Sequence, residues 1–180
     1  MELATPVARY LGEDDREALA DFRCSTGAWY EDEVETFITS QLLQRHAARR
    51  VHSRHTIIGL ETAGGDLVAV GAHEEDLLQD GDHVFTGTLL EVAAVAIEAQ
   101  GATLPGVEPF EDGRPVSVGR YLLETLMSDA DRPSREPVFR AIVAKDNGRS
   151  RALCTRVGLT RVLEDRDPRF EQRLGSFSRG

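Results

Sequence analysis

The sequence predicts a mixed α/β sheet in a single domain that spans residues 1–180. Three observations lead to this class. Hydrophobic residues change between helical and strand periodicity along the chain, hairpins and crossovers both connect the expected strands, and no shift in composition marks a linker. Hydrophobic residues make up 41% of the chain and charged residues 29%, which is typical of a globular protein.

The N-terminal half is expected to contain a strand, a helix and a hairpin. Val7–Leu11 is the first short strand, and the helix follows over residues 29–48. The helical periodicity comes from Val34, Phe37, Ile38 and Leu42, and acidic residues near the start suit the helix dipole. Residues 56–61 and 67–72 are strands joined by the hairpin turn at 63–66.

The middle of the chain is expected to form a long strand and then a helix. The strand covers about residues 84–98 and ends in an apolar run. Residues 99–116 form a loop, because four prolines and glycines lie between Gly101 and Pro109. The helix starts at Val118, and its apolar face contains Leu122, Leu123, Leu126 and Met127.

The C-terminal part is expected to add a strand, a short helix and a hairpin. Val138–Ala144 is the strand, and residues 150–157 are the helix, for which Gly158 is a suitable C-terminal cap. A last hairpin contains residues 162–163 and Phe170.

The charge excludes some functions without selecting one. The net charge is −10, from 31 acidic and 21 basic residues, which argues against a nucleic-acid binder and permits cationic substrates. Cys24 and Cys154 are too far apart for a disulfide framework and are expected to be reduced thiols. We expect no metal site, no membrane segment and no signal peptide, and therefore a cytoplasmic protein.

The informative junction is Arg114-Pro-Val-Ser-Val-Gly-Arg-Tyr-Leu-Leu123, where a loop leads into a helix. Small residues at Ser117 and Gly119 let backbone N–H groups approach a ligand, and a helix N-terminus carries about half a positive charge. These features are typical of a phosphate or pyrophosphate site. Ordinary helix capping is the alternative interpretation.

Three segments together resemble the GNAT superfamily of acyl-CoA-dependent N-acyltransferases. The junction is similar to its pyrophosphate loop, with Arg114, Ser117 and Gly119 at the signature positions and Ser117 in place of a glycine. Residues 90–97 resemble the central strand of the family, and residues 147–159 resemble its last motif. The resemblance covers about residues 84–160.

The resemblance implies a fold and a co-substrate. The central sheet would be mixed and mostly antiparallel, with flanking helices and a V-shaped splay between its two central strands. Acetyl-CoA would lie in that splay, its pantetheine paired to the backbone of Val95, Ala96 and Ile97. The resemblance implies that Asn147 binds the pantetheine arm, and the alternative interpretation is that Asn147 is an ordinary helix cap. The pyrophosphate would bind N–H groups of Ser117, Val118, Gly119 and Arg120, with Arg114 and Arg120 offsetting its charge.

Catalysis needs a base for the amine and an acid for the departing thiolate. Glu91 occupies a position where some members carry a catalytic glutamate, while pairing with an arginine or pointing to solvent is the alternative. Cys154 stands where the family usually carries a tyrosine that acts as the acid. The alternative interpretation is that Cys154 is an ordinary buried residue of the helix. Tyr30 or Tyr121 would be the proton donor if the fold brings one of them near.

The resulting expectation is an N-acetyltransferase that moves an acetyl group from acetyl-CoA to a primary amine directly, in a ternary complex. The acceptor is a small-molecule amine or a basic peptide, and homodimers are common in the family. The alternative is a weakly active or inactive GNAT-fold module that binds CoA or a protein partner.

Overall fold

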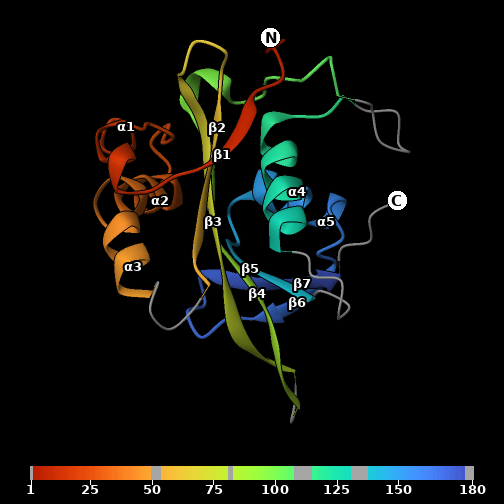
Figure 1. Cartoon of the computed structure of the whole chain (residues 1–180). Coiled ribbons are helices and arrows are strands. Elements are labelled where there is room, and N and C mark those ends of the chain that lie inside the picture. Colours follow the sequence, from red (N-terminus) through yellow and green to blue (C-terminus); the bar gives the residue numbers. More distant parts are fainter. Residues whose placement is uncertain (1, 50–53, 81–82, 108–114, 131–137, 177–180) are drawn as a thin grey trace.

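A computed structural model describes residues 2–49, 54–80, 83–107, 115–130 and 138–176 (Figure 1). These residues form a seven-stranded sheet in the order β1-β2-β3-β4-β5-β7-β6. The strands are β1 (Val7–Tyr10), β2 (Thr56–Glu61), β3 (Leu67–Asp80), β4 (His83–Val95), β5 (Val138–Ala144), β6 (Arg161–Glu164) and β7 (Phe170–Ser176). The helices are α1 (Arg16–Ala20), α2 (Trp29–Ser40), α3 (Leu42–Arg49), α4 (Val118–Ala130) and α5 (Gly148–Arg156), with 3₁₀ turns η1 (Glu13–Asp15) and η2 (Ile97–Ala99).

Helices cover both faces of the sheet. Helices α1, α2 and α3 lie on one face and α4 and α5 on the other (Figure 1). The core is divided in the same way. Leu19, Ile38 and Leu42 pack with one set of sheet residues, and Leu122 and Leu126 pack with another. The sheet is therefore the middle of three layers, as expected for an α/β protein.

The two central strands separate along most of their length. Every neighbouring pair in the sheet is antiparallel except β4 and β5, which are parallel and pair only where Thr88–Leu90 meets Phe139–Ala141. Beyond Leu90, β4 continues to Val95 without a paired strand on that edge among the described residues. This confirms the mixed, mostly antiparallel sheet with a V-shaped splay.

A bulge in β4 changes which face its residues occupy. Ala72 pairs with Val92, but His73 pairs with Leu90, so Glu91 is an extra residue on β4. Leu90 consequently packs with α4, and Val92 packs with α2 and α3.

Several boundaries differ from those predicted. The helix expected over 29–48 is two helices, because α2 ends at Ser40 and α3 begins at Leu42. Strand β3 continues to Asp80 through acidic residues that obscure the strand pattern. Strand β4 ends at Val95, shortly before η2 begins at Ile97. Helix α5 begins two residues earlier than predicted. Gly158 does follow α5, with a left-handed φ of 92°, which agrees with its predicted capping role.

Candidate active site

A cavity of about 500 Å³ lies where β4 separates from β5. Its lining comes from α2 on one face of the sheet and from α4 and α5 on the other, so the cavity extends across the open edge of β4. The polar and charged side chains in its described lining are Cys24, Tyr30, Glu31, Gln100, Ser117, Asn147, Arg149, Ser150 and Arg156.

The open edge of β4 presents backbone groups to this cavity. The N–H of Ala96 donates to Val68 O at 2.9 Å, and neighbouring residues of an antiparallel strand alternate in direction. The N–H groups of Ala93 and Val95 therefore face away from β3, and both residues line the cavity. Val95, which the resemblance named as a pantetheine contact, therefore presents its N–H to the cavity.

Ala96 and Ile97, which were predicted to pair with a ligand, bond within the protein. The N–H of Ile97 donates to Arg23 O at 3.0 Å, and the carbonyls of both residues accept bonds within the turn at η2. The physical reason is that the strand ends at Val95. Neither residue is part of the described cavity lining.

The start of α4 contributes two of its predicted residues to the lining, Ser117 and Gly119. Ser117 Oγ accepts a hydrogen bond from Arg120 N at 3.3 Å and so caps the helix. A Cβ atom at Gly119 would lie 3.4 Å from Leu153 and 3.5 Å from Val95, both of which also line the cavity. The glycine therefore keeps this wall open.

Two other predicted residues of the junction have different surroundings. Val118 is buried in the core, and its N–H donates to Ala102 O at 3.2 Å. The Arg120 guanidinium is also buried, and its Nε donates to Glu124 Oε1 at 3.0 Å. Neither residue lines the described cavity, and Arg114 lies outside the described residues.

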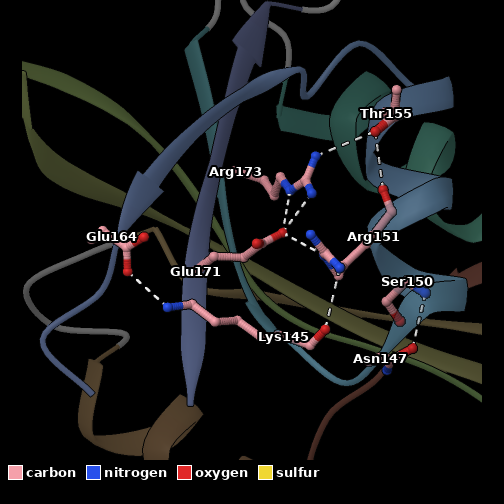
Figure 2. Close-up of polar contacts among 8 residues, drawn as sticks. All are labelled: Lys145, Asn147, Ser150, Arg151, Thr155, Glu164, Glu171 and Arg173. Carbon is pink, nitrogen blue, oxygen red and sulfur yellow. Dashed lines mark hydrogen bonds and ion pairs between the residues drawn. The ribbon is translucent and has the colours of Figure 1, made fainter. Parts of the chain in front are cut away.

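The start of α5 completes the opposite wall. Asn147 caps this helix, since its Oδ1 accepts from Ser150 N at 2.9 Å (Figure 2), and it also lines the cavity. Both interpretations of Asn147 therefore fit its position. Arg149 and Arg156 add cationic side chains to the lining that sequence reasoning did not single out. Their place in the motif region was the available signal.

A buried carboxylate fixes α5 against the sheet. Glu171 on β7 accepts from Arg151 Nε at 3.0 Å and from Arg173 Nε at 2.6 Å (Figure 2). Burial by itself would raise the pKa of Glu171, but the hydrogen bonds from Arg151 and Arg173 outweigh it and lower that pKa. Glu171 thus links Arg151 on α5 to Arg173 on β7.

Glu91 belongs to a polar cluster on the α3 face. Its Oε2 lies 2.6 Å from His55 Nε2, and its Oε1 forms an ion pair with Arg45. Arg45 also lies 3.6 Å from the buried carboxylate of Glu74, and the His46 ring lies 3.0 Å from that of His55. Glu91 is not part of the described cavity lining, and its contacts match the arginine-paired alternative.

Cys154 packs inside the protein. Its side chain belongs to the core between α4, α5 and the sheet, and it is absent from the described lining of the cavity. Burial raises the pKa of this thiol to about 11. This position favours the packing interpretation of Cys154 over the role of proton donor.

The α2 end of the cavity contains a different set of groups. Tyr30 and Glu31 line it from the first turn of α2, and Cys24 lines it from the preceding loop. Burial, with smaller effects of Glu35 and Glu31, raises the pKa of the Cys24 thiol to about 12. Tyr121, the other tyrosine considered as a proton donor, packs against the core instead.

Comparison with solved structures identifies the fold. No protein-family model and no curated protein matches the sequence. The PaiA N-acetyltransferase of Thermoplasma acidophilum, in complex with coenzyme A, is 14% identical, and the match covers 95% of this chain and 98% of that chain with a TM-score of 0.61. The chain has the GNAT fold.

Two more solved structures match this GNAT fold over most of their length. AtaTR bound with acetyl-CoA is 12% identical and has a TM-score of 0.62, with 96% of this chain and 93% of that chain covered. A Corynebacterium glutamicum structure described as histone acetyltransferase HPA2 and related acetyltransferase is 13% identical, with 98% of each chain covered and a TM-score of 0.57.

No helix in the described ranges has the length and apolar character needed to cross a membrane. The described His, Cys, Asp and Glu side chains include no group of three placed to hold a metal ion.

Proposed function

We propose that this protein is an N-acetyltransferase that moves an acetyl group from acetyl-CoA to a primary amine. The observation that carries the proposal is one cavity that joins an unpaired strand edge at Ala93–Val95 to the N-termini of α4 and α5. An extended pantetheine can pair with the strand edge, and helix N-termini attract phosphate. Related folds bound to acetyl-CoA or coenzyme A support this use of the cavity.

The donor would bind mainly through backbone groups and arginines. Ser117 and Gly119 would contact the pyrophosphate at α4, with charge supplied by Arg149 and Arg156 of α5. Arg114, which lies outside the described residues, is the further source of charge that the family resemblance implies. Asn147 would contact the pantetheine arm through its amide nitrogen, since its Oδ1 already caps α5. Val95 would pair with the pantetheine, whereas the N–H groups of Ala96, Ile97 and Val118 donate within the protein and would not bind the donor.

The transfer would be direct, in a ternary complex with both substrates bound. The amine nitrogen forms a bond to the thioester carbonyl carbon, and the carbon–sulfur bond breaks to release the CoA thiolate. The acceptor binds as an ammonium ion, so one proton leaves it for the base and gives the neutral amine that attacks. The nitrogen loses a second proton as the amide forms, and one proton is given to the thiolate, so the products are an N-acetyl amine and CoA. A negative oxygen develops at the carbonyl and requires nearby N–H donors.

Glu91 is the base proposed from the sequence, and its position determines the route by which the proton would reach it. Glu91 does not line the described cavity, so its proton would arrive through a water molecule. For the thiolate, Tyr30 is the better proposal than Cys154, because Tyr30 lines the cavity and Cys154 lies in the core.

A second function is a GNAT-fold module that binds CoA or a protein partner without transferring the acetyl group. The positions of Glu91 and Cys154 favour this second function, because the Glu91 oxygens contact His55 and Arg45 and Cys154 is buried, so neither group faces the cavity.

Under the first function, the acidic net charge favours a cationic small molecule or a basic peptide as the acceptor. We also propose a cytoplasmic location, and the family resemblance makes a homodimer the first assembly to test.

Calorimetry with acetyl-CoA, followed by thiol release on a panel of primary amines, separates the two functions. Transfer predicts binding and an amine-dependent release of CoA thiol, with the N-acetyl product seen by mass spectrometry. Binding without turnover on any amine would select the module. A titration in which acetyl-CoA does not bind would contradict both the transferase and a module that binds CoA.

A further inference from the structure

We propose that Glu31 recognises the positively charged amine of the acceptor, at the α2 end of the cavity. This inference rests on the proposed function, since it divides the same cavity into a donor end and an acceptor end. Tyr30 and Val34 would form the remaining wall of the acceptor end.

The charges of the cavity differ between its two ends. Arg149 and Arg156 lie at the α5 end, together with the N-termini of α4 and α5. Glu31 is the one carboxylate among the described lining residues, and it lies on α2, across the sheet. A polyanionic donor is favoured at the first end and a cation at the second.

The carboxylate of Glu31 is held in place by the preceding loop. Its Oε2 accepts hydrogen bonds from Thr26 N and from Thr26 Oγ1, both at 2.7 Å. Both bonds orient the carboxylate without neutralising it, because a backbone amide and a hydroxyl carry no net charge. A fixed anion of this kind binds a cation with little loss of side-chain entropy.

The other acidic residues in the first turns of α2 have different partners. Asp32 accepts from Ser25 Oγ at 2.5 Å, and Glu35 accepts from the N–H groups of Cys24 and Ser25. Glu33 lies 3.3 Å from Arg169, in an exposed ion pair. None of these three residues lines the described cavity, so Glu31 differs from its acidic neighbours on α2 in facing a ligand site.

The wall beside Glu31 suits an amine carried on an apolar or aromatic group. Tyr30 packs edge-to-face with Trp29 at 5.6 Å between ring centroids, which limits the orientations of the Tyr30 ring. Val34 lies one helical turn after Tyr30 on α2 and adds aliphatic surface to the lining. We therefore infer an acceptor that combines a primary ammonium group with an adjacent hydrocarbon chain.

The test compares Glu31→Gln with a matched control, Glu33→Gln. Both variants remove one negative charge from the first turns of α2, but only Glu31 lines the cavity. The glutamine at position 31 retains an oxygen that can accept from Thr26, so the loop contact is preserved. Calorimetry measures binding of butylamine, 1,4-diaminobutane and a lysine-containing peptide to protein saturated with CoA, which cannot react.

We expect Glu31→Gln to weaken amine binding about tenfold, as for a lost charge-assisted contact, with acetyl-CoA affinity unchanged. The Glu33→Gln variant should bind the amines as the parent protein does. Equal effects of the two variants, or no amine binding by the parent protein, would overturn the inference. Amine binding that depends on Glu31 without any turnover would retain the acceptor site and contradict the proposed transfer.

Discussion

His55 Nε2 lies 2.6 Å from Glu91 Oε2, in a cluster where Arg45 pairs with the other oxygen of Glu91. The proposed base is therefore held by His55 and Arg45 on the α3 face of the sheet. The bulge in β4 turns its side chain to this face, because Glu91 is the unpaired extra residue between Leu90 and Val92. Any catalytic role of Glu91 has to be separated from its role in this cluster.

Replacement of Glu91 by glutamine tests the base directly. If Glu91 takes the amine proton, turnover at pH 7 should fall about 100-fold in Glu91→Gln while the acetyl-CoA affinity persists. The control is His55→Gln, which removes the contact between His55 and Glu91 but keeps the Glu91 carboxylate. Turnover that is unchanged between pH 6 and pH 9 in Glu91→Gln would remove Glu91 as base, and equal losses in both variants would indicate a structural role.

Cys154→Ala separates packing from acid catalysis. The thiol lies in the core, and burial raises its pKa to about 11, so its removal should cost stability rather than chemistry. We expect about 1 kcal/mol less stability to denaturant and unchanged turnover per folded molecule. A large loss of turnover with unchanged stability would assign the proton donor to Cys154 instead of Tyr30.

Gly119→Ala should change stability and binding in opposite directions. Alanine is favoured over glycine within a helix, so the stability of the free protein should rise by about 0.5 kcal/mol. The new Cβ would lie 3.4 Å from Leu153 and 3.5 Å from Val95 and would narrow the cavity at the donor end. Acetyl-CoA should then bind more weakly in calorimetry. Unchanged affinity would show that the donor does not approach this wall.

The stability contributed by Glu171 should depend on pH. Its folded-state pKa is lowered by Arg151 and Arg173 against the opposing effect of burial, so the ionised form stabilises the fold. That contribution is present above the unfolded pKa of about 4.3 and is lost as the pH falls through the folded value. Glu171→Gln should be about 3 kcal/mol less stable at pH 7, with the difference shrinking below about pH 4 in denaturant titrations. A difference independent of pH would contradict the assignment.

The sequence was most informative where one local pattern determines both structure and chemistry. Ser117 and Gly119 were predictable because small residues at a helix start act locally, and both line the cavity. The apolar spacing from Val118 onward predicted α4 for the same reason. The splay required the family resemblance, because no local pattern indicates where two strands cease to pair.

The acceptor end of the cavity depends on contacts that local sequence does not encode. Tyr30 and Glu31 line the cavity only because α2 packs across the sheet from α5. Likewise, the bulge at Glu91 follows from the register between β3 and β4, and its partner Arg45 is distant in the sequence. The N–H groups of Ala96 and Ile97 donate within the protein because β4 ends just before them. Periodicity locates such a boundary only within a few residues.

A crystal structure with CoA bound tests the central claim most directly, because it locates both ends of the donor. The account predicts pantetheine alongside Ala93 and Val95, the pyrophosphate between the N-termini of α4 and α5, and the CoA sulfur directed toward Tyr30. CoA bound outside this cavity, or with its pyrophosphate at the α2 end, would contradict it.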